Sequence, residues 1–218
     1  MIRLSARPTL AIILLAALAL GLAGCSLFAP EEGGGGGGGG DDYKERTTRP
    51  NVIHNLIRSY QEMEADEYVD LLADDFEFWL NPADLNDPQN PLPDYWGRAE
   101  EAAVAHNMLD EGTNVISIAL TLTQLGSETE IPGPNPEDPS TWVVVYDVDL
   151  FVYLPNDLTL WANAAAQYTF SEDPNETGPN GETLWEILKW EDIDDPARPT
   201  VPGDFELISI TDLKASFR

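Results

Sequence analysis

Basic residues are scarce in this 218-residue sequence, in which 11 lysines and arginines stand against 39 aspartates and glutamates. The formal net charge is −28 at pH 7. Nucleic acid and anionic membrane surfaces would repel so acidic a chain, so its charge argues against both as partners. Cationic ligands and divalent ions are compatible with it.

The sequence also lacks a second cysteine and a long apolar run. Cys25 is the single cysteine, so no disulfide can stabilise the folded part. The most apolar stretch, residues 9–20, falls short of the roughly 20 residues that a bilayer-spanning helix needs. No catalytic motif and no metal-binding motif is recognisable, and we therefore predict neither a catalytic residue, nor a metal, nor a cofactor.

An export signal occupies the first 24 residues. Arg3 and Arg7 precede the apolar stretch, and small residues follow it up to Cys25. A basic start, a short apolar core and small residues at its end are typical of a signal peptide. A plain signal peptide with an incidental cysteine, or an uncleaved helix, is the alternative.

Leu22-Ala23-Gly24-Cys25 resembles the lipobox of bacterial lipoproteins. The resemblance implies cleavage before Cys25, a diacylglycerol thioether on its sulfur, and acylation of its amine by a fatty acid such as palmitate. Several acyl chains together anchor a protein stably. Ser26 implies the outer membrane as the destination, with the protein facing the periplasm, whereas an Asp there would imply the inner membrane.

Residues 25–49 are predicted to form the lipid anchor and a flexible linker. They contain an unbroken glycine run, Gly33 to Gly40, and glycine loses the most entropy when it becomes ordered. As a random coil this linker would span roughly 25–30 Å. A phosphate-binding loop is rejected, because no strand precedes the run and no Lys-Ser/Thr follows it.

Residues 50–218 form the predicted domain, which begins with helices. Apolar residues recur at helical spacing over 50–64, and Asp66 can cap a second, shorter helix. Residues 76–80 look like a first strand. A third helix is expected from Gly97 to Gly112. Its expected inner stripe consists of Ala99, Ala102, Ala103, His106 and Leu109.

Strands dominate the second half. Residues 116–123 alternate in polarity, and the even positions of 142–154 are all apolar. Further strands are predicted at 158–170, 184–193 and 205–217. If they form a meander, the loops 126–140 and 171–183 leave the sheet at one end. Helices followed by long strands indicate an α+β domain, with the N-terminal helices on one face of a strongly curved antiparallel sheet.

The run Leu71-Leu72-Ala73-Asp74-Asp75-Phe76-Glu77-Phe78 after two helices, with the late Trp185-Glu186-Ile187-Leu188-Lys189-Trp190 strand, resembles the nuclear transport factor 2-like superfamily. This superfamily includes the SnoaL-like cyclases and ketosteroid isomerase. The resemblance implies a cone-shaped half-barrel whose cavity serves isomerisation, dehydration, cyclisation, binding, or only as a core.

An isomerase of this kind needs a carboxylate base facing a tyrosine and a protonated acid. The resemblance places these roles near Leu80 or Asn81, near Leu56 and near Ala166. None of these residues can fill its role, which argues against isomerase chemistry.

Two acidic groups suggest cation sites only weakly. Asp147 and Asp149 share a strand face and could share a cation, although a solvated acidic face explains them as well. Asp84, Asn86 and Asp87 lack the glycine and the bidentate glutamate of a calcium loop.

The candidate ligand-binding residues are one titratable group and several aromatic groups. His106 could be a general base in the cavity or a hydrogen-bonded core histidine. The full candidate set is His106, Tyr95, Trp96, Tyr146 and Trp161.

The sequence therefore predicts an envelope-tethered lipoprotein whose cone-shaped domain binds a small molecule or a partner protein without catalysis. The alternative is a hydrolyase- or cyclase-like enzyme that uses His106 and a cavity carboxylate. A homodimer through the sheet is a further prediction for its partners.

Overall fold

The structure is a computed structural model that describes residues 42–82, 84–86, 92–110, 113–135, 138–193 and 206–218. They belong to one compact unit, Asp42–Arg218. The predicted signal peptide, Cys25 and the glycine run lie outside the described residues. Within the described ranges, no helix is long and apolar enough to cross a membrane.

Three helices precede the long strands, as predicted. α2 spans Arg49–Glu62, α3 Ala65–Val69 and α4 Arg98–Leu109. The side chain of Thr48 accepts a hydrogen bond from the Asn51 backbone N–H and caps the start of α2, where Pro50 fits the first turn. Met63, with a φ of 59°, ends α2 in the left-handed conformation. The predicted first helix is therefore confirmed to within two residues at its C-terminal end.

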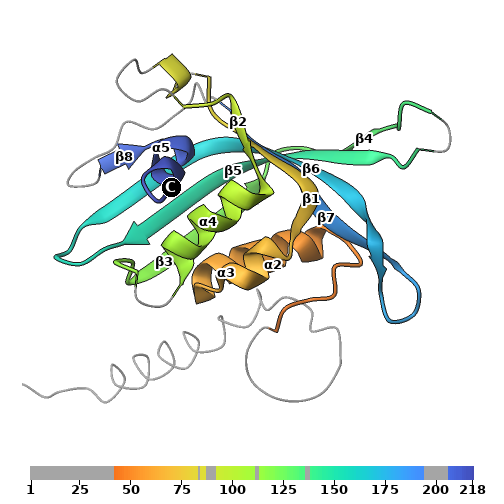
Figure 1. Ribbon diagram of the computed structural model, residues 1–218, viewed down its shortest axis with the longest axis horizontal. Coiled ribbons are helices and arrows are strands. Elements are labelled where there is room, and N and C mark those ends of the chain that lie inside the picture. The colour runs from red at the N-terminus through yellow and green to blue at the C-terminus, as the bar shows by residue number, and fades with distance from the viewer. Residues whose placement is uncertain (1–41, 83, 87–91, 111–112, 136–137, 194–205) are drawn as a thin grey trace, which may run out of the picture. The chain divides into compact units, whose positions relative to one another are not determined.

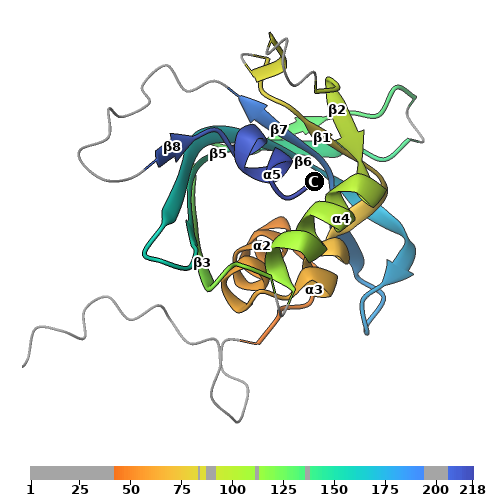
Figure 2. The ribbon, with the colours of Figure 1, turned by 60° about the vertical axis from the view of Figure 1, so that its left-hand side comes forward.

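One large sheet curves over these helices (Figure 1). The strands are β1 Leu72–Trp79, β2 Tyr95–Gly97, β3 Ser117–Gln124, β4 Thr129–Ile131, β5 Thr141–Tyr153, β6 Thr159–Thr177, β7 Thr183–Ile193 and β8 Glu206–Ile208. Their order is β2-β1-β7-β6-β5-β3, with β4 paired to β5 and β8 to β6. Figure 2 shows the helices lying in the concavity of this open sheet. The α+β class is confirmed.

The sheet is mixed, whereas an antiparallel sheet was expected. β1 pairs with β7, and β6 with β8, in parallel. No hairpin joins the strands of either pair, so nothing local forces them to run antiparallel. The other pairings are antiparallel, and β3, β5, β6 and β7 form the predicted meander.

The register of the meander confirms that both long connections leave at the same end. Gln124, the last residue of β3, pairs with Tyr146, and Phe170 of β6 pairs with Trp142. Both connections therefore leave the sheet near the start of β5. The segment 171–183 is not simply a loop, however. β6 and β7 continue as a two-stranded ribbon as far as Thr177 and Thr183.

The predicted strand 205–217 is wrong for most of its length. Only β8 is a strand, and a short helix, α5 Ile210–Ala215, follows it. The Ser209 side chain accepts a hydrogen bond from the Asp212 N–H and caps this helix. Ile210, Leu213 and Lys214 share one helical face, and all three are buried.

The predicted inner stripe of α4 is also wrong, except for Leu109. Ala99 and Ala103 are exposed. The buried face consists of Glu101, Val104, Ala105, Met108 and Leu109. This face turns the helix so that a carboxylate, rather than His106, points into the domain.

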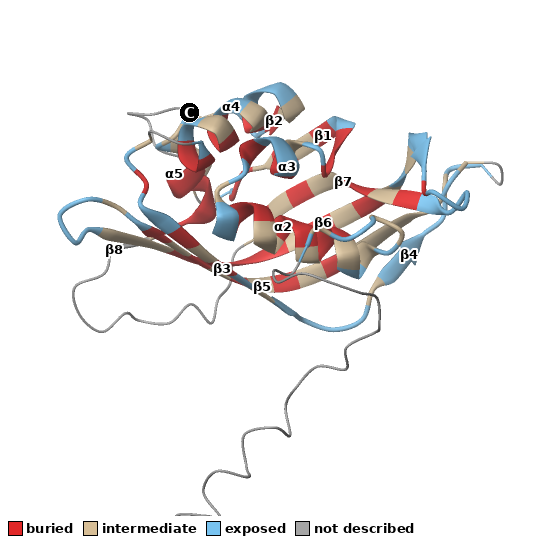
Figure 3. Ribbon diagram, turned by 90° about the horizontal axis from the view of Figure 1, so that it is seen from below, coloured by how far each residue is buried: buried red, intermediate tan, exposed pale blue. Residues whose placement is uncertain are grey.

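Large side chains fill the space between sheet and helices, where the resemblance implied a cavity. Figure 3 shows the buried residues concentrated on the facing surfaces of the helices and the sheet. The largest are almost completely inaccessible: Tyr60, Tyr68, Phe78, Trp96, Tyr168 and Trp190. The interior is therefore a packed aromatic core in this structure.

Candidate functional site

A buried ion pair lies in the centre of this core. The Lys214 ammonium on α5 contacts the Glu101 carboxylate on α4, and the two side chains are 0% and 1% exposed. The other groups on the carboxylate also come from buried side chains. Tyr68 Oη donates to Glu101 Oε1, and Trp96 Nε1 donates to Oε2 at 2.7 Å.

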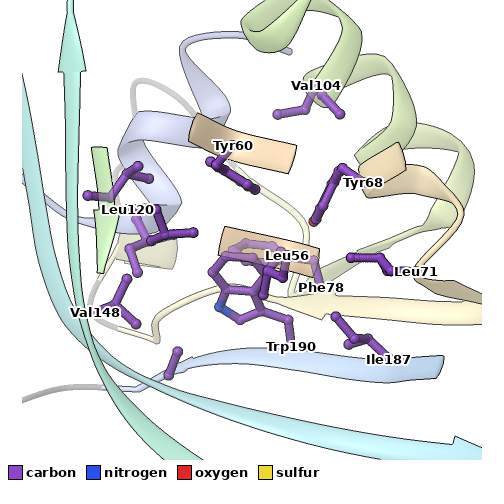
Figure 4. Close-up of a cluster of buried hydrophobic side chains, with 14 of the residues drawn as sticks. Leu56, Tyr60, Tyr68, Leu71, Phe78, Val104, Leu120, Val148, Ile187 and Trp190 are labelled. Carbon is purple, nitrogen blue, oxygen red and sulfur yellow. The ribbon is translucent and has the colours of Figure 1, made fainter. Parts of the chain in front are cut away.

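Aromatic rings surround the ammonium group. Lys214 Nζ lies 3.7 Å from the centroid of the Trp190 ring and 4.2 Å from that of Phe78. Figure 4 shows Tyr68, Phe78 and Trp190 converging in the core. Such contacts attract a cation to the electron-rich ring face. Burial lowers the pKa of Lys214, while the adjacent Glu101 carboxylate opposes that shift.

A second buried polar contact joins α5 to the sheet. Asp192 Oδ2 accepts hydrogen bonds from the Thr211 backbone N–H at 3.0 Å and from its hydroxyl at 2.8 Å. Burial raises the pKa of Asp192 to about 6. The Thr211 hydroxyl oxygen also accepts from the Asn81 N–H. Hydrogen bonds therefore fix α5 on two sides.

A polar groove of about 470 Å³ lies on the surface of the domain. It forms where residues 43–46 run between the α2–α3 helices and the ribbon of β6 and β7. Most of its charged groups are carboxylates. Its lining residues include Tyr43, Lys44, Arg46, Asn55, Glu67, Asp70, Asp74, Arg98, Asp173, Asn175, Glu176 and Glu186.

Specific contacts hold the wall formed by residues 43–46. The Lys44 N–H donates to Asn55 Oδ1 at 2.8 Å, and Asn55 Nδ2 donates back to the Lys44 carbonyl at 2.7 Å. Arg46 forms ion pairs with Asp173 and Glu176. This end of the predicted linker therefore belongs to the compact unit.

Glu186 is a partly buried acid of the groove. Burial and the nearby Asp173 carboxylate raise its pKa to about 7. Its Oε1 accepts a hydrogen bond from the Ser171 hydroxyl. The charge of the groove therefore changes near neutral pH.

Glu186→Gln is expected to change how stability depends on pH. In the wild type, the raised pKa contributes stability that is fully present below pH 4.5 and is lost as pH rises through about 7. The variant should therefore gain stability relative to the wild type above pH 7. Urea unfolding from pH 4 to 8 measures the difference. Glu130→Gln, on exposed β4, is the matched control, and equal pH profiles for the two variants would contradict the prediction.

The predicted ligand-binding residues do not converge. Trp96 is buried against Glu101, and Tyr146 is buried against Tyr168, with ring centroids 5.7 Å apart. Tyr95 is exposed and stacks on Trp79. Trp161 stacks on Phe151 and donates to Asp149. None of the predicted set lines the groove.

The expectation that His106 faces the interior is wrong. Its side chain is 43% exposed, and its ring nitrogens lie 2.9 Å from Asp110 and 3.8 Å from Asp66. The paired carboxylates are on the outer surface, so His106 is a surface group.

Neighbouring side chains engage one of the two strand-face carboxylates. Asp149 accepts hydrogen bonds from Trp161 and Asn163. Within the described ranges, no group of three or more His, Cys, Asp or Glu side chains could hold a metal ion.

The sequence interpretation missed Glu101 and Lys214, although both stand in readable patterns. Glu101 begins an apolar series at spacings of 3, 4, 7 and 8, which is the period of a buried helix face. Lys214 follows a Ser-Ile-Thr-Asp start that resembles a capping box. Read together, these patterns point to two charged residues on buried helix faces.

Comparisons with known proteins give only distant structural likenesses. No family model matches the chain, and no curated protein sequence matches it. Similar solved structures include a conserved protein of Planctomyces limnophilus, at 12% identity and a TM-score of 0.45 over 66% of this chain and 91% of that one. An NTF2-like protein with a cystatin-like fold from Novosphingobium aromaticivorans shares 16% identity, with a TM-score of 0.38 over 67% of this chain and 79% of that one. Delta 5-3-ketosteroid isomerase from Mycobacterium sp. shares 18% identity, with a TM-score of 0.35 over 65% of this chain and 88% of that one.

Proposed function

We propose that the chain is a lipoprotein of the bacterial envelope, anchored through Cys25 in the outer membrane. Its domain binds a polar small molecule or a segment of a partner protein in the surface groove, without catalysis. The groove of about 470 Å³ with its fixed polar lining is the observation that carries this proposal, because ligand sites are concave and hold a few well-placed polar groups.

The arrangement of the titratable groups supports binding rather than catalysis. A general acid or base must come within hydrogen-bond reach of its substrate. Glu101 and Lys214 are inaccessible and bound to each other, and His106 is engaged by surface carboxylates. A hydrolyase- or cyclase-like mechanism needs His106 together with a cavity carboxylate, whereas His106 lies at the surface beside Asp66 and Asp110.

Photo-crosslinking in intact cells tests the groove. Benzoylphenylalanine replaces Asn175, which lines the groove, or Asn180, which lies in the nearby turn and hydrogen-bonds Glu182. Irradiation should give adducts from position 175 and not from 180, detected by mass spectrometry of the purified chain. Equal adducts at both positions, or none at 175, would contradict binding in the groove.

His106→Gln is expected to leave both stability and cellular phenotype nearly unchanged. Exposed ion pairs contribute about 0–1 kcal/mol, so the melting temperature should shift by only a few degrees at most. Thermal unfolding and growth of a complemented deletion strain measure the two effects. A fully stable variant with a null phenotype would favour the enzymatic alternative.

A further inference from the structure

The groups around the Lys214 ammonium form a cation-binding cage that α5 does not build. Its members come from elsewhere in the chain: Phe78 on β1, Trp190 on β7, Tyr68 on α3 and Glu101 on α4. Aromatic faces combined with a carboxylate are the chemistry that recognises alkylammonium groups. Lys214 enters this cage from α5.

The carboxylate of the cage is held in place independently of Lys214. Tyr68 donates to one of its oxygens and Trp96 to the other. Both donors are themselves buried. Removing the ammonium would therefore leave a preorganised carboxyl group facing aromatic rings, rather than one free to turn away.

Three buried polar atoms near the cage are not hydrogen-bonded by Lys214. Among the residues that the structure describes, Tyr168 Oη, Trp190 Nε1 and Asp192 Oδ1 have no hydrogen-bond partner. Their residues are fully buried, and Tyr168 and Trp190 are directly paired across β6 and β7. Buried polar groups are nearly always hydrogen-bonded, so such groups call for an explanation. The interior therefore contains hydrogen-bonding groups that Lys214 does not satisfy.

We propose that the interior of the half-barrel is a binding site for the ammonium head of a small primary alkylamine, and that Lys214 on α5 occupies this site as an internal ligand. α5 thus closes the site, and an external amine must compete with Lys214 for Glu101, Phe78 and Trp190. The proposal is independent of the surface groove.

The test removes the internal ligand and supplies an external one. Lys214→Ala removes three methylenes and the ammonium group of the side chain, and n-butylamine, protonated at pH 7, is the probe. Saturating amine should raise the melting temperature of the mature, detergent-solubilised variant by about 5–10 °C at roughly a hundredfold excess over its Kd. Tryptophan fluorescence should titrate in parallel, because Trp190 and Trp96 lie at the site. Wild-type protein should bind at least about tenfold more weakly, since Lys214 competes.

Matched controls separate recognition of the charge from filling of a cavity. n-Butanol, which is neutral and of similar shape, should give no comparable shift. Lys214→Met, which keeps the volume without the charge, should not respond to the amine, and neither should Glu101→Gln/Lys214→Ala.

Several results would overturn the proposal. The first is that butylamine has no saturable effect on the melting temperature of Lys214→Ala. The second is that butanol raises this melting temperature as much as butylamine does. The third is that the wild type binds butylamine as tightly as Lys214→Ala does. If Lys214→Ala does not fold alone, refolding with butylamine should recover folded protein, and failure to do so also refutes the proposal.

Discussion

Replacing Glu101 by leucine is expected to lower the free energy of unfolding by about 3–5 kcal/mol, the range measured when one partner of a buried ion pair is removed. The variant leaves the Lys214 ammonium buried without its counter-charge. It also removes the acceptor of Tyr68 and Trp96. Because a domain of this size has only about 5–15 kcal/mol of stability, a large part of it should be lost. Urea unfolding at pH 7 measures the effect.

The chain offers a matched control one residue away. Glu100 precedes Glu101 on α4 and pairs with Arg218, but these side chains are 46% and 39% exposed. Glu100→Leu should therefore cost only about 0–1 kcal/mol. Replacing both buried charges, as Glu101→Leu/Lys214→Leu, should recover most of the loss. If Glu101→Leu costs no more than Glu100→Leu, the buried pair does not have the energetic role described here.

The meander could be predicted from the sequence because its signal is local. Alternate residues of β5 are apolar over its whole length, and Val144, Tyr146, Val148, Leu150 and Val152 are indeed the buried ones. The turn after it, at Asn156 and Asp157, has the positive φ angles of 63° and 60° that a tight hairpin requires. The alternation of apolar residues therefore predicts which face of β5 is buried, and the turn residues predict the hairpin to β6.

The interior ion pair could not be predicted in the same way. A charged residue on a helix face is normally assigned to solvent, because burying it alone is costly. That cost is offset by the hydrogen bonds from Tyr68 and Trp96 and by Lys214, which lies 113 residues away along the chain. Local patterns can indicate each buried helix face, but they do not show that these two charges meet. The same bias made the alanines and His106, rather than Glu101, look like the inner stripe of α4.

The surface groove depends even more on tertiary structure. Residues 43–46, the segment around Asp70 and the β6–β7 ribbon meet there, although they are far apart in sequence. The resemblance to cone-shaped proteins directed attention to an interior cavity. Of the bulky aromatic side chains that fill this space, Trp96 and Tyr146 were predicted to bind a ligand there, and both are buried in the core instead. A site made by such convergence can be found only once the strands are paired.

Cys25→Ser is expected to move the protein from the membrane fraction to the soluble fraction almost completely. Each buried CH₂ of an acyl chain contributes about 0.8 kcal/mol, and stable anchoring requires two signals, since one myristoyl-length chain binds only marginally. The predicted modification of Cys25 supplies several chains at one residue. The acidic chain, at −28, has no electrostatic attraction to an anionic lipid surface that could replace them.

Fractionation and metabolic labelling with an alkynyl fatty acid measure this prediction. Wild-type protein should pellet with membranes and carry the label, and Cys25→Ser should do neither. Ser26→Asp should keep the label and the anchor while moving the protein from the outer to the inner membrane. Deletion of Gly33 to Gly40 should change neither, because the linker sets the reach of the domain and not its attachment. A Cys25→Ser chain that still pellets with membranes would refute the lipoprotein proposal, whatever the crosslinking at Asn175 shows about the groove.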